Sequence, residues 1–444
     1  MSLSATIEGQ LCMGEIHCDA NVVDPGVQWA SNPTPVSLEL PPGSSPACAA
    51  TSFWSAPEGE GEGEGGEGEG EGDVGEGEGE GELWVEDYVD GQWITTVVSA
   101  VDVHGTILRP PATAADLDDD GVAEVLFTDP RGVHLVRGLM SATPSQELLL
   151  PTDMWTDGIR ELDLEDLDGD GAKDLLVVAS ESAGLRLLRG LGGGAFADPV
   201  DLLIAPPGMP NVGCSVVNGV EHCFYDMHQA SLADLDGDGD LDIVAAGPTL
   251  NVLRNDGDLA FTPVAALGAL PLGAVTYAMY AATAWRDGDV ARIVAAGRWS
   301  STQSGIPDPE GAMFALVSTD LASWTVTDGV PANTYDTELR LSRTLPGQSG
   351  DVVACGRGTR LVAVDASGAL VLGPSLGYCP RQIGDFEGDG DLDMLTDGFN
   401  QGVLLGDGAG TWTALPSTNG VPLEWASTWG DLDGDGMLEL ILIL

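Results

Sequence analysis

A short acidic motif recurs along the chain and constrains its fold more than any other feature. The clear copies are DLDDDGVAEVL from Asp116, DLDGDGAKDLL from Asp166, DLDGDGDLDIV from Asp234, DFEGDGDLDML from Asp385 and DLDGDGMLELI from Asp431. Two worn copies, starting near residues 284 and 343, keep the same phase, and successive starts lie 50, 68, 50, 59, 42 and 46 residues apart. Repetition at a period near fifty residues indicates an array of similar structural units.

Each unit contains further runs of β-forming residues, such as LNVLRNDGDLAFTPV from Leu250 and GVLLGDGAGTWTALP from Gly402. Four short β runs joined by Gly-rich turns in about fifty residues are typical of one blade of a β-propeller. With 43% hydrophobic residues, 62 Gly and 27 Pro, the chain can bury a sizeable core and make many turns. The sequence therefore predicts an all-β fold.

The last copy ends at Leu444, directly after its second β run, so its blade lacks two strands. The segment LWVEDYVDGQWITTVV from Leu83 has the missing two-strand pattern, with Asp90-Gly91 as the hairpin turn. We therefore predict a seven-bladed β-propeller over residues 83–444, closed by N-terminal strands that complete the last blade.

Two further regions precede the predicted propeller. Residues 58–82 are almost entirely Glu and Gly and include 12 acidic side chains. Such a segment has no apolar surface to bury and its charges repel, so we expect an extended, solvated linker. Residues 1–57 contain Cys and many Pro and are predicted to form a poorly structured N-terminal segment.

Within each clear copy, acidic residues stand at positions 1, 3, 5 and 9, with Gly at position 6. Alternate oxygen ligands around a tight turn suit Ca²⁺, which takes 6 to 8 oxygens, and position 7 would offer its backbone carbonyl. The side chain at position 7 varies freely, as expected where only the main chain is used. The five predicted Ca²⁺ sites consist of Asp116, Asp118, Asp120, Val122 and Glu124; Asp166, Asp168, Asp170, Ala172 and Asp174; Asp234, Asp236, Asp238, Asp240 and Asp242; Asp385, Glu387, Asp389, Asp391 and Asp393; and Asp431, Asp433, Asp435, Met437 and Glu439.

Two other interpretations of these loops are less consistent with the sequence. An EF-hand or dockerin-type loop needs helical flanks and a Glu at position 12, where this chain has Phe127, Val177, Ala245, Thr396 or Leu442. Acidic turns without a metal would hold several carboxylates close together without a compensating cation. We therefore predict calcium loops that join two β strands.

These loops resemble the FG-GAP-like (VCBS-type) repeats of integrin α-chain-type β-propellers, and the resemblance covers about 362 of the 444 residues. It implies a seven-bladed ring with Ca²⁺ in the loops between the first and second strands of a blade, and commonly a role in adhesion or extracellular recognition. The two worn copies lack the ligand pattern, and the FG-GAP tetrapeptides themselves are not kept.

The seven cysteines indicate possible disulfides and therefore an oxidising compartment. In CSVVNGVEHC, an Asn218-Gly219 turn would place Cys214 opposite Cys223 and allow a cross-strand disulfide, with a zinc site as the alternative. Cys355 and Cys379 fall in strands of consecutive blades, either paired or as buried thiols. We expect an extracellular or cell-surface protein, although residues 1–10 show no signal-peptide pattern; a truncated start would account for this.

The net charge of −55 excludes binding to nucleic acids and anionic membranes, which need clustered Lys and Arg. The uncharged stretch Leu259–Trp285 contains two Pro and follows the repeat phase, so we expect strands and no membrane span. Motifs of serine hydrolases, zinc peptidases and P-loop proteins are missing. We predict a monomeric, non-catalytic, calcium-binding recognition or adhesion module with an unknown protein or glycan ligand. The alternative is a carbohydrate-binding lectin or a polysaccharide-active enzyme on a propeller scaffold.

Overall fold

The chain consists of two units, which are described separately: Met1–Gly75 and Glu76–Leu444. Their boundary lies inside the predicted Glu-Gly linker. Every regular element in the described residues is a β strand. The computed structural model describes residues 2–3, 14–18, 38–39, 48–52, 80–81, 83–89, 92–104, 111–151, 158–181, 183–204, 213–217, 220–247, 249–267, 276–300, 311–326, 330–332, 340–343, 352–355, 359–365, 367–375, 378–397, 402–407, 411–415 and 426–443.

The first unit contains two short antiparallel pairs in its described residues. β1 (Ser2–Leu3) pairs with β3 (Leu38–Glu39), and β2 (Gly14–Cys18) pairs with β4 (Cys48–Ser52).

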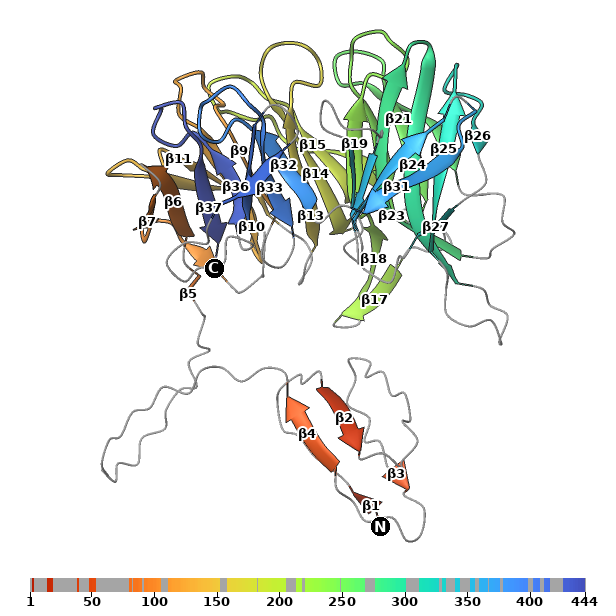
Figure 1. The fold of residues 1–444 in the computed structure, drawn as a ribbon, viewed down its shortest axis with the longest axis horizontal. Coiled ribbons are helices and arrows are strands. Elements are labelled where there is room, and N and C mark those ends of the chain that lie inside the picture. Colours follow the sequence, from red (N-terminus) through yellow and green to blue (C-terminus); the bar gives the residue numbers. More distant parts are fainter. Residues whose placement is uncertain are drawn as a thin grey trace. The chain divides into compact units, whose positions relative to one another are not determined.

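The described strands of the second unit form the seven predicted blades, each built on four antiparallel strands (Figure 1). Blade 1 contains β9 (Ala112–Ala115), β10 (Glu124–Asp129), β11 (Gly132–Arg137) and β12 (Ser145–Pro151). Blade 2 contains β13 (Ile159–Glu165), β14 (Asp174–Glu181), β15 (Ala183–Leu188) and β16 (Val200–Ile204), and the hairpin of β17 (Gly213–Val217) and β18 (Val220–Asp226) joins β14. Blade 3 contains β19 (Gln229–Ala233), β20 (Asp242–Ala246), β21 (Leu250–Asn255) and β22 (Phe261–Leu267).

The remaining blades follow the same order. Blade 4 contains β23 (Thr276–Asp287), β24 (Val290–Ser300), β25 (Gly311–Ser318) and β26 (Thr325–Val326), and β27 (Val330–Ala332) also pairs with β25. Blade 5 contains β28 (Arg340–Arg343), β29 (Val352–Cys355), β30 (Arg360–Val364) and β31 (Leu370–Ser375). Blade 6 contains β32 (Cys379–Gly384), β33 (Asp393–Asp397), β34 (Val403–Gly406) and β35 (Trp412–Ala414).

Blade 7 combines both ends of the propeller, as predicted (Figure 1). It contains β36 (Ala426–Gly430) and β37 (Glu439–Ile443), followed by β6 (Leu83–Val89) and β7 (Gln92–Val97). β37 pairs with β6 in the register Ile441 to Val85, and β6 pairs with β7. The predicted turn residues 90–91 lie outside the described residues. The ring therefore closes through hydrogen bonds between strands about 350 residues apart in sequence.

The apolar core lies between neighbouring blades. The second strands β10, β20, β29 and β37 are buried at every residue, because sheets cover both of their faces. One cluster joins Val244 of blade 3 to Ile293 and Phe314 of blade 4, and another joins Ile441 of blade 7 to Val125 of blade 1. The outermost strand β7 is mostly exposed. Each blade thus buries its faces only against its neighbours.

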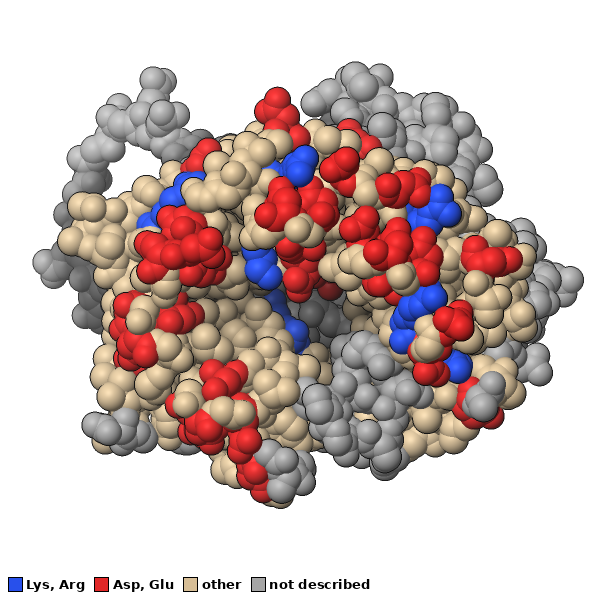
Figure 2. All heavy atoms as spheres, turned by 90° about the horizontal axis from the view of Figure 1, so that it is seen from above, with Lys and Arg blue, Asp and Glu red and all other residues tan. Residues whose placement is uncertain are grey.

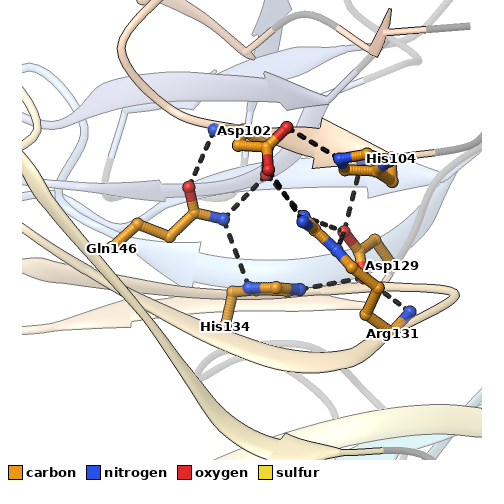
Figure 3. A network of polar contacts seen from close by, with 6 residues as sticks. All are labelled: Asp102, His104, Asp129, Arg131, His134 and Gln146. Atoms are coloured by element: carbon orange, nitrogen blue, oxygen red, sulfur yellow. Dashed lines mark hydrogen bonds and ion pairs between the residues drawn. The ribbon is translucent and has the colours of Figure 1, made fainter.

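A polar network fixes the connection from blade 7 to blade 1 (Figure 3). The backbone N–H of Asp102 donates to Gln146 Oε1 at 2.7 Å, and the Asp102 carbonyl accepts from Gln146 Nε2 at 2.7 Å and from Arg131 Nη2 at 2.8 Å. The Arg131 guanidinium also pairs with the carboxylates of Asp102 and Asp129, at 2.8 and 2.6 Å. Next to this point, β8 (Val103–His104) pairs with β5 (Glu80–Gly81).

The buried ring of His134 completes this network (Figure 3). Because Gln146 Oε1 accepts a backbone N–H, its Nε2 faces His134 Nδ1 as a donor, at 3.2 Å. Nδ1 is therefore an acceptor, and the neutral ring donates from Nε2 to Asp129 at 2.8 Å. Burial raises the pKa of Asp129, but the hydrogen bonds from His134 and Arg131 outweigh it and lower the pKa well below its usual range. Only 3% of His134 is exposed, and its ring ties β11 to Asp129 at the end of β10 and to Gln146 in β12.

A disulfide joins Cys355 at the end of β29 to Cys379 at the start of β32, with an S–S distance of 2.07 Å. It links blades 5 and 6 and decides between the two alternatives that the sequence left open. Cys214 and Cys223 are Cα partners in the β17–β18 hairpin, as predicted. Their side chains lie outside the described ones, so the second disulfide stays a prediction.

In its described residues, the apolar stretch Leu259–Trp285 forms β22 and most of β23, which confirms the strand interpretation. In the described part of the chain, no helix is long and apolar enough to cross a membrane.

Candidate metal centres

The five acidic motifs connect the first strand of a blade to its second strand, at the location that the family resemblance implies. We number them by blade: loop 1 (116–124), loop 2 (166–174), loop 3 (234–242), loop 6 (385–393) and loop 7 (431–439). Because blade 7 precedes blade 1 around the ring, these loops occupy five consecutive blades. Figure 2 shows Asp and Glu gathered in separate clusters around this face, with Lys and Arg beside several of them.

Two positions of each loop need a left-handed backbone. The Gly at position 6 has φ between 89° (Gly121) and 104° (Gly239), as its predicted role in the turn requires. Position 4 also has positive φ, between 71° and 82° in the four loops where it is Gly and 61° at Asp119. The role of position 4 was missed, although the Gly recurs there in four of the five copies.

Hydrogen bonds from the loop backbone orient the carboxylates. The position 1 carboxylate accepts the N–H of position 6 in every loop, for example Gly121 to Asp116 at 2.9 Å. The position 5 carboxylate accepts the N–H of position 7, for example Val122 to Asp120 at 2.8 Å. The backbone of each loop therefore surrounds the acidic side chains of the same loop.

The position 9 carboxylate is buried and begins the second strand. It accepts the N–H of position 2, as Leu235 donates to Asp242 at 2.8 Å and Leu432 to Glu439 at 2.6 Å. In loops 2, 3 and 6 its other oxygen accepts an N–H at the end of the third strand, such as Asn255 to Asp242 at 2.8 Å. Sequence reasoning missed position 2, an apolar residue in every loop that is fully buried in four of them.

The structure brings predicted ligands together in four loops. Carboxylate oxygens of positions 1, 3 and 9 lie within 4.8 Å of one another in loops 1, 3 and 7, and those of positions 1, 3 and 5 do so in loop 2. Loop 6 has the same backbone hydrogen bonds, but no such triple occurs among its described side chains. The backbone ligand at position 7 stays a prediction, as does the full ligand set of each site.

Burial and mutual repulsion make these carboxylates costly to ionise in the absence of a cation. Burial, followed by the charges of neighbouring acids, raises the pKa of Asp242 to about 6 and that of Glu439 to about 7. The pKa values of Glu124, Asp174 and Asp393 are also raised, mainly by burial. Hard oxygen donors that converge around excess negative charge fit a divalent cation such as Ca²⁺.

The first worn copy has no such loop. Its positions 1 and 9, Ala284 and Arg292, lie within β23 and β24, where Trp285 is the partner of Arg292 and Asp287 that of Val290. The strands therefore continue to a two-residue turn at Gly288 and Asp289. In the second worn copy, residues 344–351 lie outside the described ranges.

Three comparisons relate the chain to known proteins. The family model of the FG-GAP-like repeat matches residues 116–177, from loop 1 through loop 2 into β14. No curated protein sequence matches the chain significantly. One similar solved structure, described as the basis of specific recognition of non-reducing terminal N-acetylglucosamine by an Agrocybe aegerita lectin, is 16% identical and covers 82% of this chain and 95% of its own, with a TM-score of 0.42. Similarity at this level carries no conclusion about ligands. The repeat match and the seven blades together support an FG-GAP repeat β-propeller.

Proposed function

We propose that this propeller binds calcium in its five acidic loops and acts as a non-catalytic extracellular recognition or adhesion module. The observation that supports calcium most strongly is the convergence of buried carboxylates at the start of the second strands. Asp242 and Glu439 are 0% and 2% exposed and stand beside further carboxylates of the same loops. Buried like charges are stable in this arrangement only when protonated or compensated by a cation.

Bound calcium would stabilise the junctions between blades. Each loop contacts the next blade through its position 2 carbonyl or a neighbouring group: Leu167 accepts from Asn255 Nδ2 at 2.8 Å, and Leu235 accepts from Arg286 Nη1 at 2.6 Å. A cation that binds only the folded loops stabilises the protein by about 2.7 kcal/mol per site at 100 times its Kd. The calcium loops would thus set both the charge and the rigidity of the face that carries them.

The extracellular assignment is supported by the disulfide between Cys355 and Cys379, since such bonds persist in oxidising compartments. The non-catalytic assignment rests on the sequence, from which the motifs of serine hydrolases, zinc peptidases and P-loop proteins are missing. The ligand is a protein or a glycan and the propeller acts as a monomer in our proposal.

The recognition role is tested with the intact chain on arrays of glycans and of extracellular matrix proteins, with calcium and with chelator. We expect binding to one class that is lost in chelator. Turnover of an arrayed polysaccharide would contradict the non-catalytic assignment, and absence of binding to both classes would contradict the recognition role.

A further inference from the structure

We propose that the five sites differ in affinity, and that Arg189 makes loop 2 a weak, calcium-responsive site by occupying its ligands when metal is absent. This inference rests on the proposed calcium binding. Arg189 Nη2 lies 2.5 Å from Asp168 Oδ2 and 3.0 Å from Asp170 Oδ2, at positions 3 and 5 of loop 2. The Asp168 side chain is 1% exposed, so the guanidinium covers an oxygen that the metal needs.

The strand register places Arg189 at a third-strand position that lies beside the acidic loop in each loop-bearing blade. In blade 2, position 10 of the motif pairs with Leu188, directly before Arg189. The same pairing in the other loop-bearing blades places the following residues beside their loops: Arg137 in blade 1, Arg254 in blade 3, Leu405 in blade 6 and Asp87 in blade 7. This third-strand position is therefore a cation, an apolar group or an acid, depending on the blade.

The arginines of blades 1 and 3 are held by other acids. Arg254 pairs with Asp256 at 2.6 Å, and Arg137 pairs with Glu147 at 3.2 Å. The residue equivalent to Asp256 in blade 2 is Leu191, because the two turns have the same hydrogen bonds: Asp256 N–H to the Ala260 carbonyl at 2.9 Å, and Leu191 N–H to the Ala195 carbonyl at 2.8 Å. Without an acid at its own turn, Arg189 contacts the loop.

The carboxylates that converge in loop 2 differ from those of the other loops, and the guanidinium contacts two of them. Its converging triple consists of positions 1, 3 and 5, whereas position 9 replaces position 5 in loops 1, 3 and 7. Calcium affinity follows the charge of the ligand set, so the guanidinium of Arg189, which contacts two of these carboxylates, weakens this site.

Blade 7 has the opposite charge at the third-strand position. Asp87 follows Glu86, the partner of Leu440 in the strand register, so it lies beside loop 7. Burial, and then the carboxylates of Asp433 and Asp435, raise the pKa of Asp87. Asp87 comes from the N-terminal strand β6, so ring closure adds an acid to the last site. Loop 7 therefore has more negative charge than its own motif supplies.

Calcium titration of the metal-stripped full chain by calorimetry tests this inference. We expect four tight sites and one site about ten-fold weaker, because binding in loop 2 must break two ion pairs. Arg189→Leu should bring the weak site to the affinity of the others. Leu191→Asp should do the same while keeping Arg189, because it gives blade 2 an acid at the place where Asp256 holds Arg254 in blade 3. Leu191 is exposed, so the fold tolerates the change.

Two further variants complete the test. Asp168→Asn should remove only the weak site, and Asp87→Arg should weaken one tight site by a similar factor. Five equivalent sites in the natural chain, or a weak site unchanged by both Arg189→Leu and Leu191→Asp, would overturn the inference and leave calcium binding intact. Absence of any binding would instead refute the proposed function.

Discussion

Metal-free protein should become more stable when the pH is lowered from about 7.5 to about 5.5. The pKa of Glu439 is raised to about 7 and that of Asp242 to about 6 in the folded protein, because burial disfavours their charged forms. A raised carboxyl pKa stabilises the folded state below the unfolded pKa, and this contribution is lost as the pH rises through the folded pKa. The loss therefore falls in the neutral range.

The magnitude follows from the pKa values and from 1.36 kcal/mol per pKa unit. Over this pH interval the unfolding free energy should rise by about 2 kcal/mol through Glu439 and about 1 kcal/mol through Asp242. The raised pKa values of Glu124, Asp174 and Asp393 act in the same direction. The pKa of Asp129 is lowered, so the stability that this carboxylate contributes is lost only at more acidic pH, where it becomes protonated.

Urea denaturation of metal-stripped protein at both pH values measures this gain, and Glu439→Gln should remove about 2 kcal/mol of it. Protein saturated with calcium should show the opposite sign, because protons displace the metal at the lower pH. If the unfolding free energy of the metal-free protein stays constant or falls when the pH is lowered over this interval, burial does not disfavour the charged forms of the loop carboxylates.

Three further predictions concern the loops, the closure and the disulfide. Asp236→Ala should lower the calcium content by one ion and reduce the melting temperature, whereas Asp289→Ala in the worn copy should change neither; equal losses, measured by elemental analysis, would show that our register is wrong. Removing residues 1–75 should leave the melt unchanged, but removing residues 1–98 should cause aggregation in light scattering, because β37 loses its partner strand. Cys355→Ser should cost about 3 kcal/mol in urea denaturation, since the bond closes a loop with a sequence separation of 24.

The fold and the loop positions were predictable because the repeated motif indicates both the number of blades and the place of each loop. Each copy of the motif marks the same first-to-second strand connection, and a last copy without its outer strands required partners from elsewhere. The strand from Leu83 was the segment with the right pattern, and it pairs with β37 as predicted.

Features that depend on register between strands were not predictable in the same way. The motif at Asp431 gives no indication that Asp87 stands beside it, because that acid comes from the other end of the propeller. Likewise, Arg189 contacts loop 2 because blade 2 has Leu191 at the place of Asp256, the acid that pairs with Arg254 in blade 3. The pairing of Cys355 with Cys379 depended on the distance between adjacent blades, so spacing alone left it open.

We propose above all that calcium occupies the five acidic loops and stabilises the folded propeller. Elemental analysis of the purified full chain after dialysis against calcium, combined with thermal melts in calcium and in excess chelator, tests it most directly. We predict five calcium ions per chain, with the loop 2 ion lost first on dilution, and a melting temperature that falls in chelator. A chain that contains no calcium after this dialysis and melts at the same temperature in chelator would contradict it.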